Sequence, residues 1–158
     1  MRTGYKALLL GALALPLAGA AETSPMNAGR WEVVMKGVSG TIGEKPMTDA
    51  AVAAGNRTKF ACLSAADARD PEIYFKRSGM TGAGECGAPS GSAQGGRVSL
   101  SATCSKGETS AQLALAGTYG PAAFHLDADG RMTIGSTPLT MKVAIDGRHV
   151  GACKGDEE

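Results

Sequence analysis

The stretch PLTMKVAI, residues 138–145, decides the fold because its apolar side chains recur at every second position. These apolar residues are Leu139, Met141, Val143 and Ile145. An alternation of period two is typical of a β-strand with one buried face and one solvated face. Such strands occur mostly in antiparallel sheets. The stretch therefore predicts an antiparallel β protein.

Three further stretches, residues 30–36, 97–104 and 109–119, alternate in the same way. Their apolar faces carry, in chain order, Trp31, Val33 and Met35; Val98, Leu100, Ala102 and Cys104; and Ala111, Leu113, Leu115 and Tyr119. Turn signals separate the stretches, and Asp-Gly pairs favour type I′ hairpins. These signals are Gly120-Pro121, Asp127-Ala128-Asp129-Gly130 and Asp146-Gly147. We expect a meander of about seven strands that forms a small antiparallel β-barrel or sandwich.

One short helix interrupts this pattern. Ser64 resembles an N-cap with an acidic residue, Asp67, three positions later, and Asp70-Pro71 limits the helix to a couple of turns. Residues 37–55 and 79–96 are rich in Gly, Ser and Pro and are predicted to be loops. No second domain is indicated, so residues 21–158 are expected to form a single β domain.

Residues 1–20 have the pattern of a cleavable export signal. Arg2 and Lys6 precede an apolar stretch that ends in Ala18-Gly19-Ala20, an A-x-A cleavage site. Ala20 stands where a lipoprotein signal would have its cysteine, so no lipid anchor is predicted. Loss of this leader would bring the net charge of the chain from +1 to −1. We expect a soluble periplasmic or secreted protein without membrane insertion, and the absence of a basic run disfavours nucleic acid as a partner.

The four cysteines are expected to form two disulfides, because export leads to an oxidising compartment. Of the three connectivities, a hairpin near residues 94–96 favours Cys86–Cys104, which leaves Cys62–Cys153 as the second pair. An Asp146-Gly147 hairpin would turn Cys153 away from this partner unless Gly151 carries a bulge.

Short motifs along the chain resemble a proteobacterial exported family of unknown function, numbered 3617. They are Gly29-Arg30-Trp31-Glu32, Phe60-Ala61-Cys62-Leu63-Ser64, the strand that ends in Cys104, and Gly151-Ala152-Cys153. The resemblance implies a periplasmic context and transfers no activity, cofactor or ligand.

The motifs that could support catalysis or metal binding are incomplete. Residues 82–87 match G-x-G-x-x-G but lead into Pro89 instead of a helix. His125 and His149 lack metal-ligand spacing, and Asp127-Ala128-Asp129-Gly130 lacks the glutamate that closes a calcium loop. The methionines form no Met-x-x-Met cluster for copper, and the spacing of Glu32, Asp67, Glu72 and Asp127 favours no carboxylate pair. We therefore expect no cofactor, no metal and no enzymatic activity.

The sequence favours a non-catalytic binding or accessory protein that holds a small apolar ligand. A β-barrel with an apolar inner face offers a cavity for such a ligand. The residues expected on this ligand or core face are Trp31, Leu113, Leu115, Met141 and Val143. The alternative is a protein-interaction module, such as an inhibitor or an envelope-complex accessory, that acts through the Gly-rich loop at residues 79–96.

Overall fold

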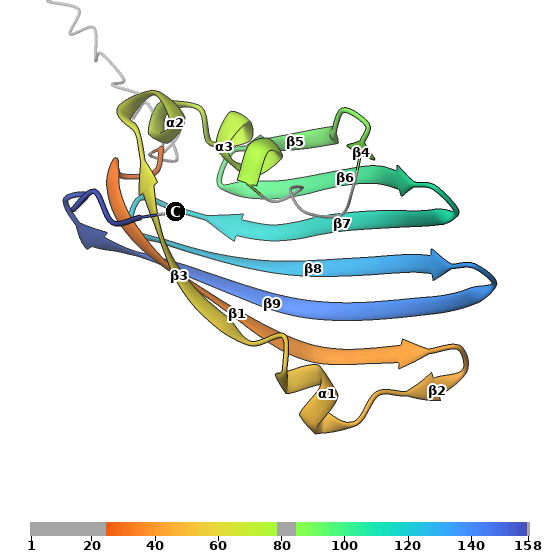
Figure 1. Ribbon diagram of the computed structural model, residues 1–158. Coiled ribbons are helices and arrows are strands. Elements are labelled where there is room, and N and C mark those ends of the chain that lie inside the picture. Colours follow the sequence, from red (N-terminus) through yellow and green to blue (C-terminus); the bar gives the residue numbers. More distant parts are fainter. Residues whose placement is uncertain (1–24, 79–84, 158) are drawn as a thin grey trace, which may run out of the picture.

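The computed structural model describes residues 25–78 and 85–157, which form one antiparallel sheet of nine strands (Figure 1). The strand order is β2-β1-β9-β8-β7-β6-β4, with β3 paired to β1 and β5 paired to β6. The strands are β1 Gly29–Ile42, β2 Lys45–Pro46, β3 Arg57–Leu63, β4 Glu85–Cys86, β5 Ser90–Gln94, β6 Arg97–Lys106, β7 Thr109–Tyr119, β8 Ala123–Ile134 and β9 Thr137–Gly151. The expected mainly β, antiparallel fold is confirmed. The predicted leader, residues 1–20, lies outside the described residues.

The sheet is curved but open, so neither a closed barrel nor a sandwich describes it (Figure 1). Its path runs from β2 and β3 at one edge to β4 and β5 at the other, and these edges are not paired with each other. The sheet has more strands than expected because both predicted loops contain strands. Residues 37–55 contain the end of β1 and all of β2, and residues 79–96 contain β4 and β5. Residues 79–84 of the expected protein-interaction loop lie outside the described residues, and its described part contributes β4 and β5 to the sheet.

Two predicted turns lie inside strands. Asp127-Ala128-Asp129-Gly130 is part of β8, and Asp146-Gly147 is part of β9. Their aspartates occupy alternate positions on the solvated face, where Asp129 forms an ion pair with Lys142 at 2.7 Å. The hairpins turn instead near Gly107 and Gly135, whose φ angles of 59° and 58° suit glycine. The aspartates thus continue the alternation of a strand and do not end it.

Within residues 25–78 and 85–157, three short helices accompany the sheet: α1 Asp49–Ala53, α2 Ala65–Arg69 and α3 Pro71–Ser78. The predicted helix is α2, and the Oγ of its N-cap Ser64 accepts a hydrogen bond from the backbone N–H of Asp67 at 3.1 Å. The expectation of a single helix was wrong. Pro71 opens α3 because proline suits the first turn of a helix, and Thr48 caps α1. Among the described residues, every helix is too short and too polar to cross a membrane.

The hydrophobic core lies at one end of the sheet, beneath β3, α2 and α3 (Figure 1). Trp31, Leu63 and Phe75 are among its largest fully buried side chains. The ring of Phe75 in α3 packs against Phe124 and Tyr119 of the sheet, each at a centroid distance of 5.6 Å. The helical layer therefore covers only the half of the sheet in which these rings lie.

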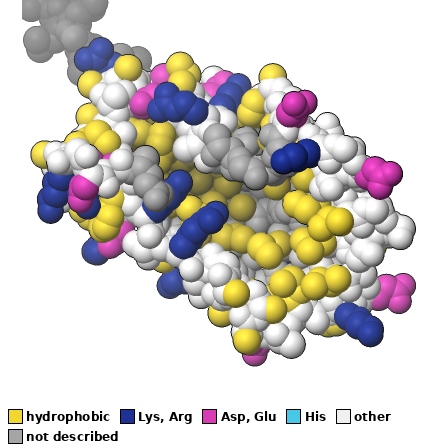
Figure 2. All heavy atoms as spheres, viewed as in Figure 1, with side chains coloured by type: hydrophobic (Ala, Val, Ile, Leu, Met, Phe, Trp, Pro, Cys, Tyr) yellow, Lys and Arg dark blue, Asp and Glu magenta, His cyan; other side chains and the backbone are white. Residues whose placement is uncertain are grey.

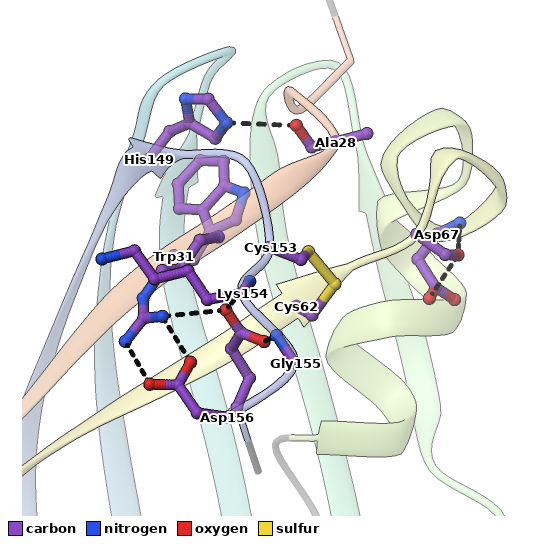
Figure 3. The surroundings of a disulfide bond; sticks show 12 residues. Ala28, Trp31, Cys62, Asp67, His149, Cys153, Lys154, Gly155 and Asp156 are labelled. Carbon is purple, nitrogen blue, oxygen red and sulfur yellow. Dashed lines mark hydrogen bonds and ion pairs between the residues drawn. A yellow bond between two sulfur atoms is a disulfide. The ribbon is translucent and has the colours of Figure 1, made fainter.

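Two disulfides cross-link the chain near the two edges of the sheet. Their pairing, Cys62–Cys153 and Cys86–Cys104, is the one that the sequence favours. The first links β3 to the segment that follows β9 (Figure 3). It requires the bulge expected near Gly151: Arg30 pairs with Gly151 but Trp31 pairs with His149, so one strand carries an extra residue. Gly151, with a φ of 119°, accommodates this irregularity.

Candidate ligand-binding groove

The five residues predicted for the ligand or core face divide into two groups. Trp31 lies in the core with 0% of its surface exposed, and its ring stacks on Phe124 at a centroid distance of 5.6 Å. The other four line one cavity of about 250 Å³ on the concave face of the sheet. They are Leu113, Leu115, Met141 and Val143. Of these, Leu115 is buried and the other three are half-buried. Trp31 is thus a core residue, and the others form the floor of a groove.

The floor of the groove is a grid of neighbouring positions on β7, β8 and β9. In the register of the sheet, Leu113 lies opposite Gly130, and Gly130 lies opposite Met141. The adjacent rows are Leu115, Ala128 and Val143, and Ala111, Met132 and Leu139. All nine side-chain positions lie on one face because side chains of paired residues point the same way. In Figure 2, hydrophobic side chains gather in a hollow over this part of the sheet.

The hollow forms because the middle strand has small residues where its neighbours have large ones. Ala128 and Gly130 of β8 lie between the long side chains of β7 and β9. A Cβ atom at Gly130 would meet only ordinary contacts, 3.7 Å from Cδ2 of Leu113 and 3.8 Å from the carbonyl oxygen of Met141. Gly130 therefore leaves space that a larger side chain could fill, and this space is part of the groove.

The groove continues toward the core through two neighbouring cavities. One, of about 50 Å³, is lined by Phe75, Leu115 and Ile145, among others. The other, of about 740 Å³, extends beneath β3 and shares Ala128 and Val143 with the 250 Å³ cavity. Leu115 likewise lines both the 250 Å³ and the 50 Å³ cavities. The apolar groove thus leads from the open half of the sheet to β3.

α1 and the preceding Met47 pack against the concave face of β1. Gly37 lies opposite Val143, on the concave face, and a Cβ atom there would be 2.4 Å from the carbonyl oxygen of Val52 in α1. Gly40 lies opposite Met141, and a Cβ atom there would be 2.5 Å from Sδ of Met47. The two glycines are required for this close approach, which packs α1 and Met47 against β1.

β3 brings two positively charged side chains to the groove. Arg57 and Lys59 both line the 740 Å³ cavity, and Lys59 also lines the 50 Å³ cavity. The Cys62–Cys153 disulfide anchors the end of β3, and Arg30 binds Asp156 and Glu157 of the same C-terminal segment (Figure 3). This cross-linked segment holds β3 in its place beside the groove.

The candidate carboxylates and histidines lie apart from the groove. Three of the four carboxylates are bound to cations, in the pairs Glu32–Arg148, Asp67–Arg77 and Glu72–Lys76. Hydrogen bonds from Arg77 and Ser64 lower the pKa of Asp67. On the convex face, Nδ1 of the exposed His125 lies 2.7 Å from Oδ1 of Asp146, and this hydrogen bond raises the pKa of His125. These contacts have structural roles, and they assemble no pair of free carboxylates.

His149 and the cysteines do not form a metal centre. Within the described ranges, the potential ligand atoms of Cys62, Cys153 and Glu157 lie within 4.8 Å of one another. However, both sulfur atoms belong to a disulfide, and metal binding requires thiolates. The ring of His149 packs against Trp31 at a centroid distance of 5.7 Å, outside this cluster (Figure 3).

Sequence reasoning missed Gly130, Met132 and Leu139 in the floor, and Arg57 and Lys59 at the side of the groove. Gly130 belonged to a predicted turn, although its distance of two residues from Ala128 continues the alternation of a strand. Arg57 and Lys59 are also two residues apart, and the apolar Leu63, four residues after Lys59, continues the same alternation. That spacing is a signal for a strand whose inner face begins with charges and ends in the core.

The comparisons with known proteins identify a family and no homologue of known activity. No curated protein and no solved structure matches the chain. One family model matches, over residues 26–153, and its description is "Protein of unknown function (DUF3617)". Because this match covers most of the sequence, from Met26 at the edge of the core to Cys153 of the first disulfide, the chain belongs to the DUF3617 family.

Proposed function

We propose that this protein is a non-catalytic binding protein that holds a small apolar ligand in the groove on the concave face of its sheet. The observation that carries this proposal is the 250 Å³ cavity, which among the described residues is lined by β7, β8 and β9 alone. Leu113, Met141 and Val143 remain half-buried there, whereas equivalent apolar positions at the other end of the sheet are sealed by α3. Concave apolar sites of this kind are the usual form of small-molecule sites.

The groove supports binding better than catalysis. The side chains of its floor are aliphatic and thioether groups, which lack a nucleophile or a general base. Asp129 and Arg131 also line the cavity, and Asp129 forms an ion pair with Lys142. Three of the four candidate carboxylates (Glu32, Asp67 and Glu72) and His125 are engaged elsewhere, in ion pairs and hydrogen bonds. Binding of an apolar ligand would be favoured by the free energy gained when the apolar surfaces of the ligand and of the floor are removed from water.

The proposed place of action is the periplasm of a proteobacterium or the medium outside the cell. The leader pattern at residues 1–20 supports export, and two disulfides are typical of an oxidising compartment. Intact mass of the protein exported in its native host should correspond to residues 21–158 without a lipid. A retained leader or a diacylglycerol adduct would contradict this location.

A substitution that fills the groove tests the proposed function. Gly130→Leu places an apolar side chain in the space between Leu113 and Met141, where a Cβ atom fits without a clash. The wild-type protein should bind N-phenylnaphthylamine, an uncharged dye that fluoresces in apolar surroundings, and Gly130→Leu should bind it at least tenfold more weakly. The melting temperature should stay unchanged or rise, because glycine weakens a strand interior.

Ala116→Leu is the matched control. Ala116 also lies in the sheet, on β7, but it is exposed on the opposite face, so the same added side chain should leave dye binding unchanged. Absence of dye binding by the wild-type protein, or equal binding by the wild type and Gly130→Leu, would contradict the proposed function.

A further inference from the structure

Two cations of β3 are directed into the groove by the register of the sheet. Arg57 lies opposite Met35 and Lys59 lies opposite Val33, and both partners belong to the concave face. Nε of Arg57, an exposed residue that lines the 740 Å³ cavity, donates a hydrogen bond to Sδ of Met35 at 3.3 Å. Lys59 is half-buried against apolar residues that include Leu115 and Ile145. The inner face of β3 thus presents positive charge to an apolar surface.

Neither cation has an acidic partner in the part of the chain that the structure describes. The salt bridges within residues 25–78 and 85–157 involve neither Arg57 nor Lys59. Asp156 is the one carboxylate among the residues that line the 740 Å³ cavity, and it is bound by Arg30. Partial burial of an unpaired charge is unfavourable because the charge loses part of its hydration, and Lys59 is half-buried. An anionic group of a ligand would compensate the charge at this place.

The apolar part of the groove extends along the direction of the strands. On β9, the floor runs from Ile145, beside β3, to Leu139 near the opposite end. These residues are six positions apart, which corresponds to about 20 Å at the rise of a β-strand. The 250 Å³ cavity spans three strands, β7, β8 and β9, so its floor is longer along the strands than it is wide. A long unbranched hydrocarbon chain laid along the strands would contact this floor over its length.

From these observations we infer that the ligand is a long-chain carboxylic acid. Its carboxylate lies between Arg57 and Lys59, and its hydrocarbon chain extends along the floor past Val143 and Met141 toward Leu139. This assignment rests on the proposed function and adds to it the class and the orientation of the ligand. Charge-assisted hydrogen bonds from both cations select the carboxylate, and burial of the chain supplies affinity.

Displacement of N-phenylnaphthylamine by palmitate and by hexadecanol tests the assignment. The two compounds share a chain length and differ in the charge of the head group. For the delipidated wild-type protein at neutral pH, palmitate should displace the dye at a concentration about tenfold lower than hexadecanol, as expected for a hydrogen bond to a charged group. The double variant Arg57→Gln and Lys59→Gln should lose this preference and keep its affinity for hexadecanol.

Lys36→Gln provides the matched control, because Lys36 is an exposed cation of the adjacent β1 on the convex face. It should retain the preference for palmitate, and melting temperatures of all variants should show that they are folded. Equal displacement by both compounds in the wild type, or an unchanged preference in the double variant, would overturn the assignment and leave the proposed function intact. Failure of the wild type to bind the dye and both compounds would overturn the two together.

Discussion

At the scale of single residues, Trp31 illustrates how the same apolar face serves two purposes. Its Nε1 donates a hydrogen bond to the carbonyl oxygen of Asn27 at 2.9 Å, so its polar atom is satisfied within the core. Phe124 stacks on one side of the ring and His149 meets its edge. These contacts make Trp31 an anchor of the packed end of the sheet and separate it from the groove.

Trp31→Ala should therefore destabilise the protein strongly. Replacement of a fully buried tryptophan by alanine lowers the free energy of unfolding by about 3–5 kcal/mol. Urea unfolding measures this change, and Trp31→Phe should lose less because it retains the stacking on Phe124. An unchanged free energy of unfolding for Trp31→Ala, or a native fluorescence maximum typical of exposed indole, would contradict the structural role.

Residue-level reasoning predicted the floor of the groove better than its charged side. Leu113, Met141 and Val143 follow from alternation within single strands. The position of Lys59 depends on contacts distant in sequence, namely the pairing of β3 with β1 and the cross-link to Cys153. A pattern within one segment cannot show that this strand folds over the face formed by β7, β8 and β9.

At the scale of elements, strands with strict apolar alternation were predicted and strands with small or acidic residues were missed. β8 was divided at a predicted turn because Asp127 and Gly130 are common in hairpins. In the folded protein, cross-strand pairing of Asp129 with Lys142 supports a continuous strand. α3 was missed because Pro71 suggested the end of a helix, whereas it begins one. Tertiary contacts thus override local turn preferences in the middle of the sheet.

The two disulfides should differ in their contribution to stability. Cys62–Cys153 closes a loop with a sequence separation of 91, and Cys86–Cys104 closes one of 18. In the chain-entropy account, the long loop contributes about 4–5 kcal/mol and the short one about 3 kcal/mol.

Paired serine substitutions measure this difference. Cys62→Ser with Cys153→Ser should lower the free energy of unfolding in urea more than Cys86→Ser with Cys104→Ser. The reverse order would indicate that the anchoring of β3 contributes less to the fold than its position suggests.

At the scale of the whole molecule, the decisive feature is that α2 and α3 cover only half of an open sheet (Figure 1). The covered half is a packed core around Trp31 and Phe75, and the other half is a hollow lined by apolar side chains (Figure 2). The expected barrel would have enclosed its ligand face. The open sheet leaves this face accessible along one side, with Lys59 at the junction between the two halves.

The central claim is that the hollow half of the sheet, and not the packed half, binds an apolar ligand. Methionine-methyl NMR during titration with palmitate tests it most directly, because Met132 and Met141 lie in or beside the floor and Met26 lies in the core. The account predicts that the methyl signals of Met132 and Met141 shift on titration and that the signal of Met26 stays in place. Unchanged signals of Met132 and Met141 at saturating palmitate, or a shift confined to Met26, would contradict it.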